Sequence, residues 1–75
     1  MRDFTNHLLS MADRIARKPL DRGVLSTGEL IAVAIVLNKP QWLKEAGHTL
    51  SSALTRLGAD ELSETLIAAS VWKEQ

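Results

Sequence analysis

The run LIAVAIVL, residues 30–37, limits the possible folds more than any other feature of this chain. It places eight consecutive apolar residues in the middle of a protein of only 75. As a helix the run is about 12 Å long, well short of the roughly 20 residues that cross a bilayer, so we expect no membrane span. A segment that is apolar on every side has to be covered on every side, either by the rest of its own chain or by a second chain.

The run itself is compatible with a buried strand or a buried helix, because half of its residues are β-branched. Ser26 and Glu29 have the S-x-x-E spacing of a capping box, which starts a helix. Asn38 followed by Pro40 is a plausible end for that helix. No second segment forms a convincing strand, and a lone strand leaves its backbone groups unpaired. We therefore predict a helix.

An amphipathic helix is predicted over residues 3–17. Its apolar residues recur at intervals of four, three and four: Phe4, Leu8, Met11 and Ile15. Pro19 ends this helix, because the residue before a proline is disfavoured in helical conformation. The connection of residues 18–25 carries three apolar side chains that we expect to anchor it to the core: Leu20, Val24 and Leu25.

Three more helices are predicted in the second half of the chain. The first covers residues 39–46, with Pro40 in its first turn and Gly47 as its cap. The second begins at Thr49 and ends before Gly58. The third is expected to begin with Asp60 as its cap. It carries these apolar residues: Leu62, Leu66, Ile67 and Val71.

These elements predict a single all-α domain over residues 1–75, a bundle of four or five short helices around the central apolar helix. The composition is ordinary for a globular domain, with 45% apolar and 24% charged residues, and the absence of cysteine excludes disulfides. Four short amphipathic helices are barely enough to surround a fifth. A second chain is thus an alternative source of cover.

Catalytic residues are hard to find in this sequence. His7 lies four residues after Asp3, a spacing typical of a surface pair, and His48 fits a turn before a helix. Glu61 and Glu64 are expected to favour the helix dipole and solubility. We find no glycine-rich phosphate loop, nucleophile elbow or set of metal ligands. We predict a protein that is not an enzyme and that binds no cofactor or metal.

A DNA-binding alternative rests on residues 41–58, which have the helix, glycine turn and helix of a helix-turn-helix. The residues that would face DNA are Lys44, Ser51, Ser52, Thr55 and Arg56. Few cations are available there to neutralise phosphates, and the whole chain is balanced at nine basic and nine acidic residues. A helical hairpin packed in the bundle is therefore favoured, and nucleic acid is an unlikely partner.

Trp72 stands three residues from the end of the sequence, where a helical turn normally frays. One explanation is that it packs on its own chain, against Phe4 or Leu8. The other is a two-fold dimer in which the last helix binds its copy or the partner's first helix. The partner-binding residues would then be Leu62, Leu66 and Trp72. A basic beginning, +2 over residues 1–23, and an acidic end, −3 over residues 59–75, suit such a contact.

The sequence thus predicts a small interaction module without enzymatic activity that binds itself, as a homodimer, or another protein. A helix-turn-helix regulator is the alternative, and a catalytic role comes third. The N-terminal segment lacks the apolar stretch of a signal peptide, so we expect a cytoplasmic location and no membrane association.

Overall fold

A computed structural model describes residues 2–73 of the chain, with side chains from Phe4 onward. Its elements are α1 (Arg2–Arg17), the 3-10 helix η1 (Pro19–Val24), α2 (Thr27–Val36), α3 (Pro40–Glu45), α4 (Leu50–Leu57) and α5 (Ala59–Lys73). The described residues contain no strand, which confirms the all-α prediction. None of their helices is long and apolar enough to cross a membrane.

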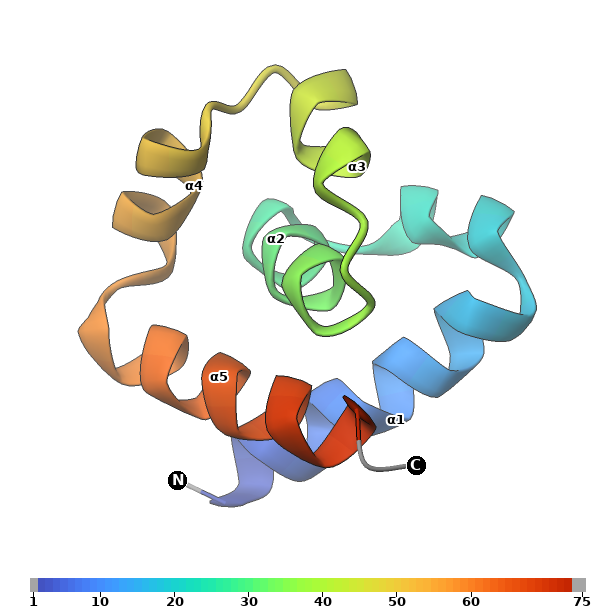
Figure 1. The fold of residues 1–75 in the computed structure, drawn as a ribbon. Helices are drawn as coiled ribbons and strands as arrows, with labels where there is room; N and C mark the ends of the chain where they lie inside the picture. Colours follow the sequence, from blue (N-terminus) through green and yellow to red (C-terminus); the bar gives the residue numbers. More distant parts are fainter. Residues whose placement is uncertain (1, 74–75) are drawn as a thin grey trace.

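Helix α2 lies at the centre of the molecule, as predicted, and the other helices surround it (Figure 1). It packs against α1, α3, α4 and α5. Five of its residues are buried: Ile31, Ala32, Val33, Ala34 and Val36. Leu30, Ile35 and Leu37 are only half-buried. The chain therefore covers most of the apolar run by itself and leaves parts of both ends of the run accessible.

The predicted start of α2 is confirmed in detail. The Glu29 amide donates to the Ser26 hydroxyl at 3.2 Å, and the Ser26 amide donates to the Glu29 carboxylate at 2.9 Å. After α2 the chain turns through Asn38, whose φ of 56° lies in the left-handed region. Pro40 then opens α3, where its missing N–H has no cost.

The connection after α1 differs from the prediction. Leu20 is 91% exposed and Val24 is 70% exposed, and only Leu25 of the three expected anchors packs on the core. Arg22 holds the connection instead. Its guanidinium lies 5.0 Å from the ring centre of Trp42 and donates to the Pro19 carbonyl at 2.9 Å. A cation–π contact of this kind gives no apolar signal in the sequence.

The cap of α5 also differs from the prediction. The helix begins at Ala59, and the Leu62 amide donates to the Gly58 carbonyl at 3.0 Å. Gly58 therefore occupies the cap position and Asp60 lies inside the first turn. Gly58 has a φ of 80°, which glycine adopts without the strain that a side chain would cause.

Helix α5 packs against α1 and α2 with a surface of small and polar residues. Its buried residues are Glu64, Thr65 and Ala68. The expectation that Glu64 is a solvent-facing carboxylate is wrong, because it accepts a 2.8 Å hydrogen bond from the Thr5 hydroxyl across the α1–α5 contact. Small side chains such as Ala68 let two helices approach closely, while Leu66 and Ile67 lie on the exposed side of α5.

Candidate functional site

The outer face of α5 is the most unusual surface of the molecule. We define it as Ser63, Leu66, Ile67, Ser70 and Val71, which recur at the three- and four-residue spacing of one helical face. Leu66 is 57% exposed, Ile67 52% and Val71 38%. The two serines are exposed as well. A helix that buries a glutamate and exposes a leucine and an isoleucine departs from the usual separation of an apolar and a polar face.

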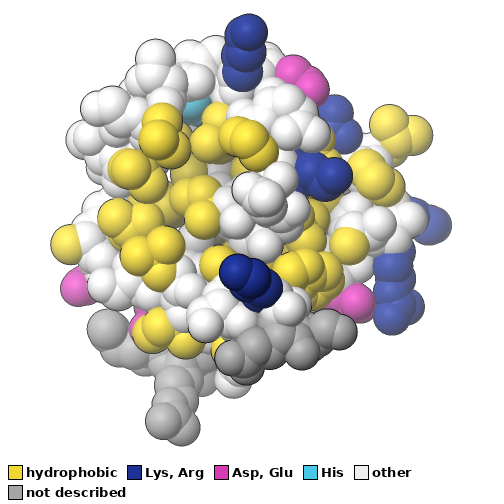
Figure 2. Space-filling view, in the orientation of Figure 1, with side chains coloured by type: hydrophobic (Ala, Val, Ile, Leu, Met, Phe, Trp, Pro, Cys, Tyr) yellow, Lys and Arg dark blue, Asp and Glu magenta, His cyan; other side chains and the backbone are white. Residues whose placement is uncertain are grey.

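An apolar groove adjoins α5 at the C-terminal end of α2. It has a volume of about 400 Å³, and Leu37 and Trp72 are among its walls. A smaller groove of about 170 Å³ lies beside it, between α2 and the starts of α3 and α4, and shares Ile35 and Asn38 with the first. Figure 2 shows hydrophobic side chains gathered on this side of the molecule, around the end of α2 and over α4 and α5. Outer face and grooves together form an extended apolar surface.

The predicted partner-binding residues occupy different parts of this surface. Leu66 points outward, and Leu62 lies half-buried at the edge of the outer face. Trp72 is half-buried and packs on the core, in the groove beside Val36 and Leu37. Six helical positions separate Leu66 from Trp72, which puts them on different sides of α5.

Sequence reasoning did not include Ile67 and Val71 in the partner-binding set. The signal that could have found them is the distribution of apolar residues around the whole circumference of the last helix. A helix that binds only a core keeps its large apolar residues on one stripe.

The residues of the DNA-binding alternative are all exposed: Lys44, Ser51, Ser52, Thr55 and Arg56. Two of the hydroxyls have local hydrogen-bond partners. Ser52 completes a capping box with Thr49, and the Thr55 hydroxyl donates to the Ser51 carbonyl at 2.9 Å. Helices α3 and α4 each pack on α2. Lys44 and Arg56 therefore remain the main contribution of this segment to phosphate binding.

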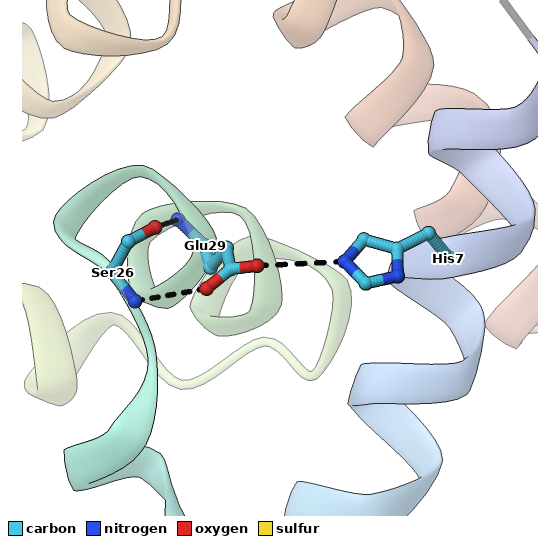
Figure 3. Close-up of polar contacts among 3 residues, drawn as sticks. All are labelled: His7, Ser26 and Glu29. Carbon is cyan, nitrogen blue, oxygen red and sulfur yellow. Dashed lines mark hydrogen bonds and ion pairs between the residues drawn. The ribbon is translucent and has the colours of Figure 1, made fainter.

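One cluster of polar side chains joins α1 to the start of α2 (Figure 3). His7 Nε2 lies 3.4 Å from the Glu29 carboxylate, whose other oxygen accepts from the Ser26 amide. The Ser26 amide, together with His7, lowers the pKa of Glu29 although partial burial opposes this. The Ser26 hydroxyl accepts from the Glu29 amide and points to the capping box, not to the imidazole. The cluster is thus a helix cap with an added histidine rather than an activated nucleophile.

The other expected polar sites have simple structural roles. His48 is half-buried in the turn between α3 and α4, where its amide donates to the Leu43 carbonyl at 2.9 Å. The predicted pair of His7 with Asp3 involves a side chain outside the described set. Among the residues whose positions are described, no three His, Cys, Asp or Glu side chains come together as a metal site.

Comparisons of the chain with protein-family models, with curated proteins and with solved structures give no match. The candidate site is therefore defined by this structure alone: an extended apolar surface around α5 and the end of α2.

Proposed function

We propose that the protein is a small interaction module that binds a second copy of itself through the outer face of α5. The observation that carries this proposal is the exposure of Leu66 and Ile67 on a helix whose buried side holds Glu64 and Thr65. Burying a large aliphatic side chain contributes about 1.5–3 kcal/mol. A partner that covers this face gains that contribution from several side chains at once.

A two-fold pairing of α5 with its copy is the simplest arrangement, because each outer face then meets the same residues on its partner. An antiparallel pairing brings Asp60 and Glu61 of one helix near Lys73 of the other. Such exposed ion pairs contribute less than about 1 kcal/mol each. They favour the antiparallel orientation, while the apolar contact supplies the affinity.

The size of the surface sets the expected affinity. The described chain has an accessible surface of 4971 Å², and a standard interface of about 800 Å² per partner would occupy about a sixth of it. A helix of 15 residues is about 22 Å long and about 10 Å wide, so its outer face offers less area than that. The contact therefore extends to Leu62 and to the groove with Leu37 and Trp72, and we expect a dissociation constant on the order of micromolar.

Sedimentation equilibrium over a dilution series tests this proposal. The wild-type mass should rise from monomer to dimer with concentration, and Ile67→Glu should stay a folded monomer. Leu20→Glu is a matched control, because it also replaces an exposed aliphatic residue by glutamate but lies on η1. We expect this control to dimerise like the wild type. A wild-type protein that remains monomeric at hundreds of micromolar would reject self-association.

A further inference from the structure

Two adjoining hollows lie on the side of the molecule formed by α1 and η1. The first is an apolar groove of about 220 Å³, with Met11, Ile15, Val24 and Leu25 in its lining. The second is a charged hollow of about 420 Å³ at the end of α1. Its charged residues are Asp13, Arg14, Arg17, Lys18 and Asp21. Arg14 lines both, so a ligand in the apolar groove lies next to a guanidinium.

The charged hollow has an excess of cations. Three basic side chains face two carboxylates, and both arginines are in ion pairs: Arg17 with Asp13 at 3.3 Å and Arg14 with Asp21 at 3.4 Å. Such long, exposed pairs are weak, so an incoming carboxylate can replace either acid. Within residues 4–73, Lys18 has no carboxylate at ion-pair distance. Figure 2 shows Lys and Arg side chains gathered on this side of the molecule.

We propose that this α1–η1 surface binds an acidic segment of a partner protein that carries one apolar anchor residue. The anchor side chain enters the groove between Met11 and Val24, and carboxylates beside it in the segment meet Arg14, Arg17 and Lys18. A cavity of about 150 Å³ holds a benzene molecule, so the groove has room for a leucine or phenylalanine side chain. The exposed Val24 becomes covered in the complex.

The charged hollow selects an acidic segment rather than a basic one, because its three cations exceed its two carboxylates, while Glu29 in the groove balances the total charge of the surface. Arginine binds carboxylates with two parallel N–H donors, and Arg14 and Arg17 lie one turn apart on α1. Glu29 and His7 close the opposite end of the groove. An acidic residue of the ligand is repelled there and attracted at Arg14, and this difference sets the direction in which the segment lies.

The α1–η1 surface shares no residue with the outer face of α5. Helix α5 packs on α1, α2 and α4, while η1 packs on α1. The inference is consequently independent of the proposed self-association, and either can fail without the other.

Fluorescence anisotropy with labelled peptides tests the inference. The probes are ten heptapeptides. Each has a central Leu, Ile, Met, Phe or Trp, with two acidic residues either directly before it or directly after it and glycine at the remaining positions. At least one should bind with a dissociation constant of about 1 mM or tighter. Replacing its central residue by Ser, or its acids by Asn and Gln, should weaken binding about tenfold.

Variants of one arginine and one lysine locate the site. Arg14→Gln should weaken binding of the best probe about tenfold, and Lys18→Gln should weaken it less. Arg56→Gln is the matched control, since it removes an exposed arginine from α4, and it should bind like the wild type. The inference is overturned if none of the ten peptides binds at 1 mM or if Arg56→Gln weakens binding as much as Arg14→Gln. Binding to vesicles of anionic phospholipid without binding to any peptide also overturns it, in favour of a lipid surface.

Discussion

Helices α2 and α5 both carry apolar residues around their whole circumference, but they differ in how much of that circumference other helices cover. Four other helices pack on α2, and five of its ten residues are buried. Helix α5 has neighbours on one side and exposes Leu66, Ile67 and Val71 on the other. The comparison shows that apolar residues all around a helix do not determine whether its own chain covers every side of it. For α2 the chain provides this cover, and for α5 we assign it to a second copy.

The two helices also differ in what they bring to the core. Helix α2 contributes branched aliphatic side chains such as Ile31 and Val33. The buried residues of α5 are Glu64, Thr65 and Ala68, and Leu62, Ala69 and Trp72 pack half-buried against the core. Dispersion and hydrophobic burial therefore hold α2, and close packing with a buried hydrogen bond from Thr5 helps to hold α5. Substitutions in the two helices should have correspondingly different costs.

The largest effect is expected for Val33→Asp in α2. Val33 is fully buried, and an unpaired carboxylate there costs several kcal/mol of a total stability of roughly 5 kcal/mol. Circular dichroism should show an unfolded chain. Ile67→Asp, the same kind of change on the outer face of α5, should retain the helical spectrum. A Val33→Asp protein that melts like the wild type would contradict the central position of α2.

Thr5→Val should have the next largest effect. This variant keeps the shape of the side chain and removes the hydroxyl that donates to the buried Glu64 carboxylate. Leaving a buried acceptor without that donor costs about 1–3 kcal/mol, measurable by urea unfolding. Thr5→Ser retains the hydroxyl and should lose less. Equal losses for the two variants would show that the methyl group of Thr5, not its hydrogen bond, joins α1 to α5.

A smaller, pH-dependent effect is expected at Glu29. Hydrogen bonds from the Ser26 amide and from His7 lower the pKa of this carboxyl in the folded protein. A lowered folded pKa stabilises the protein above the unfolded value of about 4.3, and this contribution is lost as the pH falls through the folded pKa. The stability difference between wild type and Glu29→Gln should therefore shrink between pH 6 and pH 3. A difference that does not change with pH would exclude a role for the ionised carboxylate in the cap.

The smallest effect is expected for DNA binding, which would use α4 rather than α5. With Lys44 and Arg56 as its main cations, the segment of residues 41–58 should show no measurable binding to random duplex DNA at physiological salt. Micromolar binding would favour the helix-turn-helix alternative. In that case Arg56→Ala should lower the slope of log affinity against log salt by about one unit.

The sequence predicts the parts of this fold that follow from local rules. The stripe of α1, the capping box of Ser26 and Glu29, and the all-round apolar pattern of α2 all correspond to the structure. The orientation of α5 could not be derived in this way. It depends on Ala68 fitting closely against other helices and on Thr5 meeting Glu64 across 59 positions of sequence. Tertiary contacts of this kind leave no periodic signal.

Only part of the candidate site could be predicted, because the rotation of α5 depends on the same tertiary contacts. Leu66 and Leu62 were identified as apolar residues of the last helix, but without its rotation their exposure was unknown. Ile67 was identified only as an apolar residue of the last helix, and Leu20 and Val24 were expected to anchor the connection but are exposed. The contact of Arg22 with Trp42 replaces those anchors, and a single arginine in a sequence does not show which ring it meets.

Helix α2 is covered by its own chain, and we propose that a second copy covers α5. Isotope-filtered NMR on a mixture of labelled and unlabelled protein tests it directly, because it detects only contacts between copies. At the highest attainable concentration we predict intermolecular contacts from the methyl groups of Leu66, Ile67 and Val71, and none from Ile31 or Val33. Contacts from Val33, or no intermolecular contact from α5 at all, would contradict the account.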